Sequence, residues 1–383
     1  MNKLVIFRNE ACAVRDPKQE SARSESSNVM ASALVASLRW KVKMSDTQSR
    51  VVVVTGGTAG VGRAVAREFA KKRDRVAVIG RDLGRLEATR RDIEELGGTA
   101  LPVQADMADP AQVEGAAAKV ERELGEIDVW VNNAMTTVFS PFVELEPEEF
   151  KRVTEVTYLG AVYGTMSALK RMVNRNRGTI VQVGSALAYR SIPLQSAYCG
   201  AKHAIVGFTD SIRSELAHRH SKVHMTVVHL PAVNTPQFDW CRTKLPGDPQ
   251  PVPPIYQPEV PARAIVWASS HRRREVFVGW PTVKAIYGQD VAPGFADSYL
   301  AKHGFDDQQT RKPVSPARQD NLFEPVAGNY AAHGRFDDQA IEWSMQSWLN
   351  LHRGTAAAIT GAVLGLSALA WKRLHGLAQR DVV

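Results

Sequence analysis

The chain has 383 residues, a formal net charge of +8 and only three cysteines. Half of the excess charge lies in residues 1–43, which hold eight basic and four acidic side chains, and most of the rest lies from Arg353 onward. The nearly neutral middle argues against a nucleic-acid-binding face, and the basic ends suit an anionic lipid surface. The length fits one doubly wound α/β domain of about 250 residues with extensions.

From Val51 onward, strand patterns alternate with helix patterns. We expect, in order, strand Val51–Thr55, a helix to about Lys72, strand Arg75–Ile79, helix Leu83–Leu96, strand Ala100–Gln104, helix Pro110–Leu124, strand Ile127–Val131, a long helix Pro147–Val173, strand Thr179–Val183, helix Ser196–Arg219, strand His224–Leu230, a helix near Pro258–Ser270 and strand Glu275–Val278. This alternation predicts right-handed crossovers and a parallel sheet with helices on both faces.

Extensions flank this pattern. We predict a disordered N-terminal extension over 1–49, the α/β domain over 50–285, a C-terminal extension over 286–350 and an apolar helix over 351–383. Three cysteines without a C-x-x-C pair or a His/Cys cluster indicate a reducing compartment and no metal site. No apolar stretch with a small-residue cleavage site precedes the domain, so a secretory signal is not expected and the chain is placed on the cytoplasmic side.

Two later segments have unusual composition. Prolines crowd between Pro236 and Pro261, which predicts a loop beyond the carboxyl end of a strand and a candidate substrate lid. Gly304–Ala340 has little periodicity, and two near copies, HGFDDQ at His303–Gln308 and HGRFDDQ at His333–Gln339, occur at its ends. Two copies do not make a repeat architecture, and we expect an ordered extension that packs on the domain or on a second subunit.

The uncharged stretch Thr355–Trp371 lies between Arg353 and Lys372. As a helix it is slightly short for a bilayer core, but its flanking cations and terminal tryptophan suit a membrane interface. Its Gly-x-x-x-Gly spacing also suits close helix packing. A membrane-associated helix and a buried or dimer-packing helix both remain open.

A glycine-rich turn follows the first strand, with the pattern T-G-x-x-x-G-x-G over Thr55–Gly62. Glycines let a pyrophosphate approach the backbone, and the following helix N-terminus presents unpaired N–H groups. This turn predicts a dinucleotide site, although a tight turn without a ligand is the alternative.

A tyrosine and a lysine lie four residues apart at the start of a helix, Tyr198 and Lys202, so their side chains share one face. An ammonium beside a phenol favours the phenolate, which suits proton exchange with a substrate oxygen. A helix-surface pair is the alternative. Ser185 and the run Asn132–Ala134 follow two buried strands, so they are expected at the same sheet edge as the glycine turn.

Together these motifs resemble the short-chain dehydrogenase/reductase family over about Arg50–Gly279: TGGTAGVG, Asp106, NNA, Ser185, YCGAK and PAVNTP. The resemblance implies a seven-stranded Rossmann fold and NAD(P)-dependent hydride transfer between an alcohol and a carbonyl. It implies a general acid/base at Tyr198, a supporting Lys202 that also holds the nicotinamide ribose, and a substrate-orienting Ser185. It implies cofactor binding at Thr55, Gly56, Gly60, Val61, Gly62, Asp106, Met107, Asn133, Ala134, Tyr198, Lys202, Val233 and Thr235, with Asp106 near the adenine and Thr235 near the carboxamide.

Three positions depart from the family pattern. Thr157 stands where the family usually has an asparagine, so it is the candidate for the proton relay, and a hydroxyl cannot replace every hydrogen bond of an amide. Met135 and Ala232 replace usual glycines and are expected to narrow the nicotinamide pocket.

For the cofactor, Gly80 and Arg81 at the end of the second strand leave space and a guanidinium for a 2′-phosphate, so Arg81 is a predicted cofactor contact. NADP(H) is preferred over NAD(H), with a solvated Arg81 as the alternative. We expect an oxidoreductase of a hydrophobic carbonyl or secondary alcohol, working as a homodimer or homotetramer. An NADP-binding sensor or scaffold with reduced catalysis is the second hypothesis.

Overall fold

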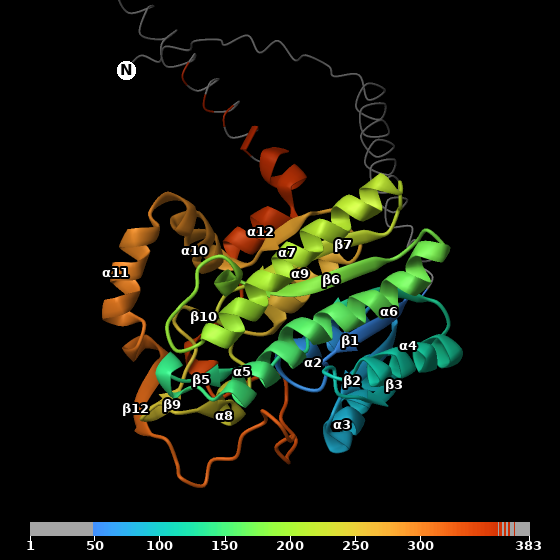
Figure 1. Cartoon of the computed structure of the whole chain (residues 1–383). Coiled ribbons are helices and arrows are strands. Elements are labelled where there is room, and N and C mark those ends of the chain that lie inside the picture. The colour runs from blue at the N-terminus through green and yellow to red at the C-terminus, as the bar shows by residue number, and fades with distance from the viewer. Residues whose placement is uncertain (1–48, 359, 362–363, 365–366, 368–370, 372–383) are drawn as a thin grey trace, which may run out of the picture. The chain divides into compact units, whose positions relative to one another are not determined.

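Seven parallel strands form the central sheet, in the order β11-β7-β6-β4-β1-β2-β3 (Figure 1). The computed structural model describes residues 49–358, 360, 361, 364, 367 and 371, and the disorder predicted for residues 1–43 lies outside them. The strands are β1 (Val51–Thr55), β2 (Arg75–Gly80), β3 (Thr99–Gln104), β4 (Ile127–Asn132), β6 (Thr179–Ser185), β7 (His224–Leu230) and β11 (Glu275–Phe277). The predicted fold class is confirmed.

The apolar strands pack against helices on both faces of the sheet. All five residues of β1 are buried, and alternate valines belong to different core clusters. Val52 and Val54 pack with residues of α2, α3 and α9, whereas Val51 and Val53 pack with residues of α4 and α6. This division follows from the two-residue period of a strand.

The covering helices are close to the predicted ones. They are α2 (Gly60–Ala70), α3 (Leu83–Glu95), α4 (Pro110–Leu124), α5 (Pro147–Thr154), α6 (Gly160–Asn174), α7 (Ser196–His218) and α9 (Glu259–Ala268). The predicted helix Pro147–Val173 is interrupted by a π-helical turn, η2 (Glu155–Leu159). The wider turn buries Thr157, the residue that the sequence marked as unusual.

The direction in which strands are added to the sheet reverses at β1, and this reversal marks the edge where a ligand site is expected. β1 pairs with β2 on one side and with β4 on the other, so the connections leave the sheet in opposite directions there. Open α/β sheets bind ligands in the crevice beyond the carboxyl ends of such strands. The glycine turn, Asn133 and the segment after β7 all follow carboxyl ends of this sheet.

Short strands tie the proline-rich segment to the C-terminal extension. The segment contains α8 (Gln237–Trp240), β8 (Arg242–Thr243), β9 (Gly247–Pro249) and β10 (Ile255–Tyr256), and β8 pairs with β5 (Val138–Phe139). The extension contributes α10 (Gly279–Val291), α11 (Pro293–His303), η4 (Asp306–Gln308), β12 (Gln309–Pro313), η5 (Asp337–Gln339), β13 (Ala340–Ile341) and α12 (Met345–Leu351). Short 3-10 turns also occur at η1 (Phe142–Glu144) and η3 (Ala186–Ala188).

An apolar helix is predicted over 355–371, and the residues of this stretch that the structure describes are helical. Within the described parts of the chain, no helix combines the length and apolar character needed to cross a bilayer. Membrane association through 355–371 therefore remains an expectation.

Candidate active site

The glycine turn between β1 and α2 has the backbone shape that its sequence predicts. Gly56 and Gly60 have φ values of +61° and +54°, a region that residues with side chains rarely adopt. A Cβ added to Gly62 would collide with the carbonyl oxygen of Gly56 and with Nδ2 of Asn133. No described side chain caps the start of α2, and the N–H of Gly60 donates to the carbonyl oxygen of Ala331 at 3.1 Å.

Thr55 and Asn133 hold this turn by hydrogen bonds, and Thr55, a predicted cofactor contact, is not among the residues that line the cavity. The Thr55 hydroxyl oxygen accepts hydrogen bonds from the backbone N–H groups of Asn133 and Ala134, each at 3.0 Å. Asn133 Nδ2 donates to the carbonyl oxygens of Thr55 and Gly56, at 3.0 and 3.1 Å. The ends of β1 and β4 are thereby fixed to each other, and Asn133 and Ala134 also line the pocket.

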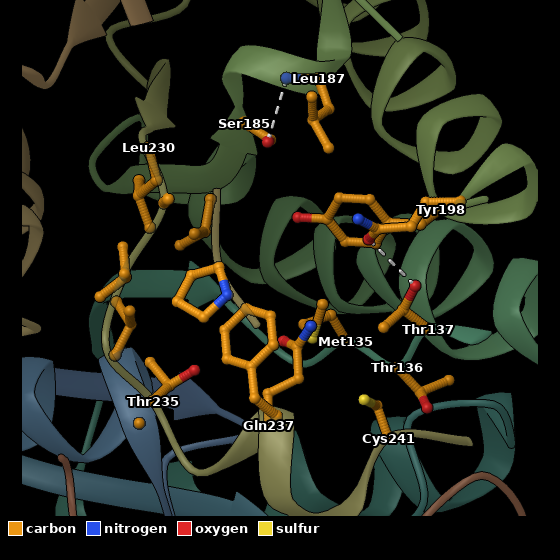
Figure 2. A pocket seen from close by; sticks show the side chains of 18 of the residues that line it. Met135, Thr136, Thr137, Ser185, Leu187, Tyr198, Leu230, Thr235, Gln237 and Cys241 are labelled. Atoms are coloured by element: carbon orange, nitrogen blue, oxygen red, sulfur yellow. Dashed lines mark hydrogen bonds between the residues drawn. The ribbon is translucent and has the colours of Figure 1, made fainter. Parts of the chain in front are cut away.

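Ser185 and Tyr198 face the same cavity, from the end of β6 and the first turn of α7 (Figure 2). The Ser185 hydroxyl oxygen accepts a hydrogen bond from the N–H of Leu187 at 3.1 Å. Lys202 lies one turn after Tyr198, with Nζ 5.5 Å from the centre of its ring. The Lys202 ammonium donates to the carbonyl oxygen of Val183 at 2.7 Å.

Burial is the largest influence on the pKa values of Tyr198 and Lys202. Burial raises the pKa of Tyr198 above the ordinary value for a phenol, although its hydrogen bond with Ser185 opposes this shift. Burial also lowers the pKa of Lys202 to about 7. The prediction that Lys202 lowers the pKa of Tyr198 remains a prediction, because Lys202 here donates to the backbone.

Thr157 does not reach the cavity. Its hydroxyl donates to the carbonyl oxygen of Thr136 at 2.9 Å and accepts from the N–H of the same residue at 3.0 Å. The side chain is fully buried, and the neighbouring Val156 lines the pocket instead. This geometry lets Thr157 position the segment after β4, and its predicted part in a proton relay stays a prediction.

Arg81 and Asp106 both line the adenine end of the predicted cofactor site. Arg81 donates through its two terminal nitrogens to the carbonyl oxygens of Phe323 and Asn321, at 2.5 and 2.6 Å. Since a guanidinium carries five N–H donors, it retains donors beyond these two bonds. Asp106 accepts a hydrogen bond from the N–H of Ala108 and forms an ion pair with Arg152.

Arg85 is a lining residue that the sequence analysis missed. It is 6% exposed and donates to the carbonyl oxygen of Val326 at 2.5 Å, and its Nε has no hydrogen-bond partner among the described residues. Its place beside the site could have been inferred from its position in the first turn of α3, four residues after Arg81, although its contacts could not.

The nicotinamide end is formed by the loop after β7. Val233 and Thr235 line the cavity, as do the two departures from the family pattern, Met135 and Ala232. Thr235 also approaches the glycine turn closely, because a Cβ on Gly60 would lie 3.2 Å from it. Gly56, Gly60, Val61, Gly62 and Met107 complete the predicted residues in the lining.

These residues surround one cavity of about 660 Å³. Part of its wall comes from the predicted lid segment, through Gln237, Phe238, Trp240 and Gln250–Pro253. Another part comes from the extension, which the sequence did not assign to the site: Lys284, Tyr299, Leu300, Gly304, Asp307, Gln308, Asn321 and Pro325. The proline-rich segment is therefore a wall of the cavity, as its predicted position suggested.

Comparison with known proteins gives one consistent family. The sequence model of the short chain dehydrogenase family matches residues 50–244. The uncharacterized oxidoreductase YxnA of Bacillus subtilis (strain 168) is 29% identical over 338 residues, covering 87% of this chain and 93% of that protein. The 3-dehydrosphinganine reductase of Danio rerio is 31% identical over 192 residues, and the match covers 49% of this chain and 57% of that protein.

A solved structure extends the comparison to three dimensions. An alcohol dehydrogenase from the archaeon Thermococcus sibiricus, complexed with 5-hydroxy-NADP, matches with a TM-score of 0.53 and 25% identity. The match covers 60% of this chain and 96% of the archaeal one.

Proposed function

This chain belongs to the short-chain dehydrogenase family and is an NAD(P)-dependent oxidoreductase, and we propose that it prefers NADP(H) and acts on a hydrophobic carbonyl or secondary alcohol. The observation that carries the proposal is the meeting of Ser185, Tyr198 and Lys202 with the glycine turn at one cavity. The residues fit a dinucleotide, because glycines occupy the turn at positions where a Cβ would collide with Ala134, Gly56 or Asn133 and change the shape of the turn.

NADP(H) is favoured by the chemistry at the end of β2. A Cβ on Gly80 would collide with Thr58, so no carboxylate can stand there to hold ribose hydroxyls without a shift of the turn. Arg81 and Arg85 instead line the cavity, and guanidinium groups suit a 2′-phosphate. The archaeal alcohol dehydrogenase, which is complexed with an NADP derivative, supports the same preference.

The proposed chemistry uses the side chains already described. The bound nicotinamide supplies or accepts the hydride. In the direction of reduction, the Tyr198 hydroxyl gives its proton to the substrate oxygen, and the Ser185 hydroxyl orients that oxygen by a hydrogen bond. Lys202 holds a positive charge near the resulting phenolate and stabilises it. In the direction of oxidation, Tyr198 takes the proton back.

A hydrophobic substrate is favoured by the far wall of the cavity. Leu187, Ile192, Phe238, Val252 and Leu300 line it, so a polar substrate would be poorly solvated there. The zebrafish relative is named as a reductase of 3-dehydrosphinganine, and a mouse relative is named as an estradiol 17-beta-dehydrogenase. Both names support a search among lipid and steroid carbonyls.

The proposal is tested by a screen of NADPH-dependent turnover with hydrophobic ketones and aldehydes. In Tyr198→Phe we expect turnover to fall by about 10²–10⁴-fold, because the general acid is lost while the ring is kept. NADPH binding, measured by fluorescence, should stay within a few-fold of wild type. Tight binding without turnover by the wild-type chain would instead support the sensor or scaffold hypothesis.

Self-association and membrane contact remain predictions. Sedimentation of the full chain tests for the expected homodimer or homotetramer. Flotation with anionic vesicles, with and without residues 355–383, tests for the expected lipid contact.

A further inference from the structure

The two near copies in the extension form the same local structure. In each, the residues Asp-Asp-Gln make one 3-10 turn, η4 or η5, and a short strand follows at once. Strand β12 pairs antiparallel with β9, and strand β13 pairs parallel with β10. Because β9 and β10 both belong to the proline-rich segment, the extension holds that wall of the cavity at two points.

The first copy joins the wall to the catalytic helix. Gln308 is fully buried, and its side-chain oxygen accepts from Nε2 of Gln195 at 2.8 Å. Its own Nε2 donates to the carbonyl oxygen of Pro193 at 2.9 Å. Gln195 directly precedes α7, which begins at Ser196 and carries Tyr198.

The second copy holds the nicotinamide loop. Oδ1 of Asp337 accepts from Nδ2 of Asn234 at 2.8 Å and from Nε2 of Gln257 at 2.9 Å. The side-chain oxygen of Asn234 accepts from the N–H of Phe336 at 3.0 Å. Asn234 is fully buried and directly precedes Thr235, so the position of Thr235 depends on this network.

His333 completes the network. Its Nδ1 lies 2.8 Å from Oδ1 of Asp337, and its Nε2 lies 3.0 Å from Oε2 of Glu259. Ionised carboxylates only accept hydrogen bonds, so the ring can donate to both of them at once only as an imidazolium, with a proton on each nitrogen. Glu259 from α9 and Asp337 from η5 are the charged groups that face the ring, while the nearby Arg335 pairs with Asp239.

These contacts set the proton affinity of His333. Partial burial lowers its pKa, but the hydrogen bonds and charges of Glu259 and Asp337 outweigh burial and raise the pKa above the ordinary histidine value. A neutral ring can donate to only one of the two carboxylates. The tie between α9 and Asp337 is therefore complete below this pKa and is lost as the pH rises through it.

We propose that the HGRFDDQ copy is a latch on the cofactor-binding loop, and that His333 is a positioning residue that holds Asp337, and through it Asn234 and Thr235, in place for the nicotinamide. This proposal rests on the proposed function for its effect on the cofactor. The latch itself does not, because its contacts involve only this chain.

The first test needs no cofactor. Hydrogen exchange of the backbone amides of Asn234 and Phe336 is compared between wild type and His333→Gln at each of several pH values. Below the pKa of His333 we expect faster exchange in the variant, and above it we expect the two proteins to converge. The matched control is His303→Gln in the first copy, where the residue is exposed and its ring makes a tilted contact with that of Tyr299. Equal exchange of wild type and His333→Gln at pH 6 would overturn the latch.

A second variant keeps the hydrogen-bond acceptor beside His333 and changes only its charge. Glu259→Gln retains an acceptor for Nε2 of His333 but removes one charge, so the pKa of His333 should fall. The pH at which Asn234 loses protection should move down with it. An unmoved midpoint would show that His333 does not set the latch.

The third measurement connects the latch to the cofactor. At pH 6 we expect His333→Gln to bind NADPH about 5- to 10-fold more weakly than wild type, with the difference shrinking above the pKa of His333. Unchanged affinity at pH 6 would remove the proposed effect on the cofactor. If wild type binds neither NADPH nor NADH while the exchange difference persists, the proposed function fails and the latch stands.

Discussion

Lys202 shows how strongly burial acts on a single side chain of this site. The residue is 3% exposed, and burial lowers its pKa to about 7, against an ordinary value of 10.5. Between these two pH values the unfolded chain binds a proton that the folded chain does not. The free energy of unfolding of the cofactor-free protein should therefore gain from this group as the pH rises from 7 toward 10.

The measurement is denaturant unfolding at pH 7, 8 and 9 for wild type and Lys202→Met. Methionine has similar length and no charge, so the variant should lack this rise and be relatively more stable at pH 7. The difference in unfolding free energy between the proteins should shrink as the pH increases. A difference that stays constant over this range would contradict a depressed pKa.

Single residues also show what sequence could and could not predict. The positions of Tyr198, Lys202 and Ser185 follow from local spacing and strand ends, so they could be predicted as one cluster. The contacts of Thr157 and Arg85 could not. They depend on a π-helical turn and on carbonyl groups more than 200 residues away from Arg85, and neither leaves a periodic signal.

At the scale of elements, the turn between β1 and α2 is the most sensitive. We expect Gly62→Ala to weaken NADPH binding by at least about 10-fold, because the added Cβ must displace Gly56 or Asn133. The matched control is Gly207→Ala in α7, where, apart from the adjacent residues and backbone of the helix itself, no described atom lies within 4 Å of the added Cβ. That control should bind NADPH normally and gain up to about 1 kcal/mol of stability from helix propensity.

A cofactor titration and a thermal melt of both variants check this prediction. The outcome against it is equal NADPH affinity in Gly62→Ala and wild type. Such a result would mean that the turn relaxes around the added methyl group without moving the phosphate cradle.

At the scale of the whole molecule, the sheet was predictable and the extension was not. Buried strands that alternate with helices in the sequence predict a parallel sheet, because a helix that connects two such strands crosses over one face of the sheet. The extension instead docks through backbone carbonyls. Arg63, Arg81, Arg85 and Arg152 donate to carbonyl oxygens between Asn321 and Tyr330, and every peptide has such a group. The repeated HG(R)FDDQ was visible in the sequence, but its partners in the proline-rich segment were not.

The extension also changes how the cofactor preference should be tested. Because its carbonyls already engage Arg81 and Arg85, the complete chain is the right sample and a shortened domain is not. The control for Arg81→Ala is Arg91→Ala, an exposed arginine of α3 that pairs with Glu87.

The most direct measurement is a fluorescence titration of the full chain with NADPH and with NADH. We predict that NADPH binds at least about 10-fold more tightly than NADH, since charge-assisted hydrogen bonds to a phosphate contribute about 1.5–3 kcal/mol. Arg81→Ala should remove most of this difference by weakening NADPH alone, and Arg91→Ala should leave it intact. Equal or tighter binding of NADH by the wild-type chain, or binding of neither cofactor, would contradict the account.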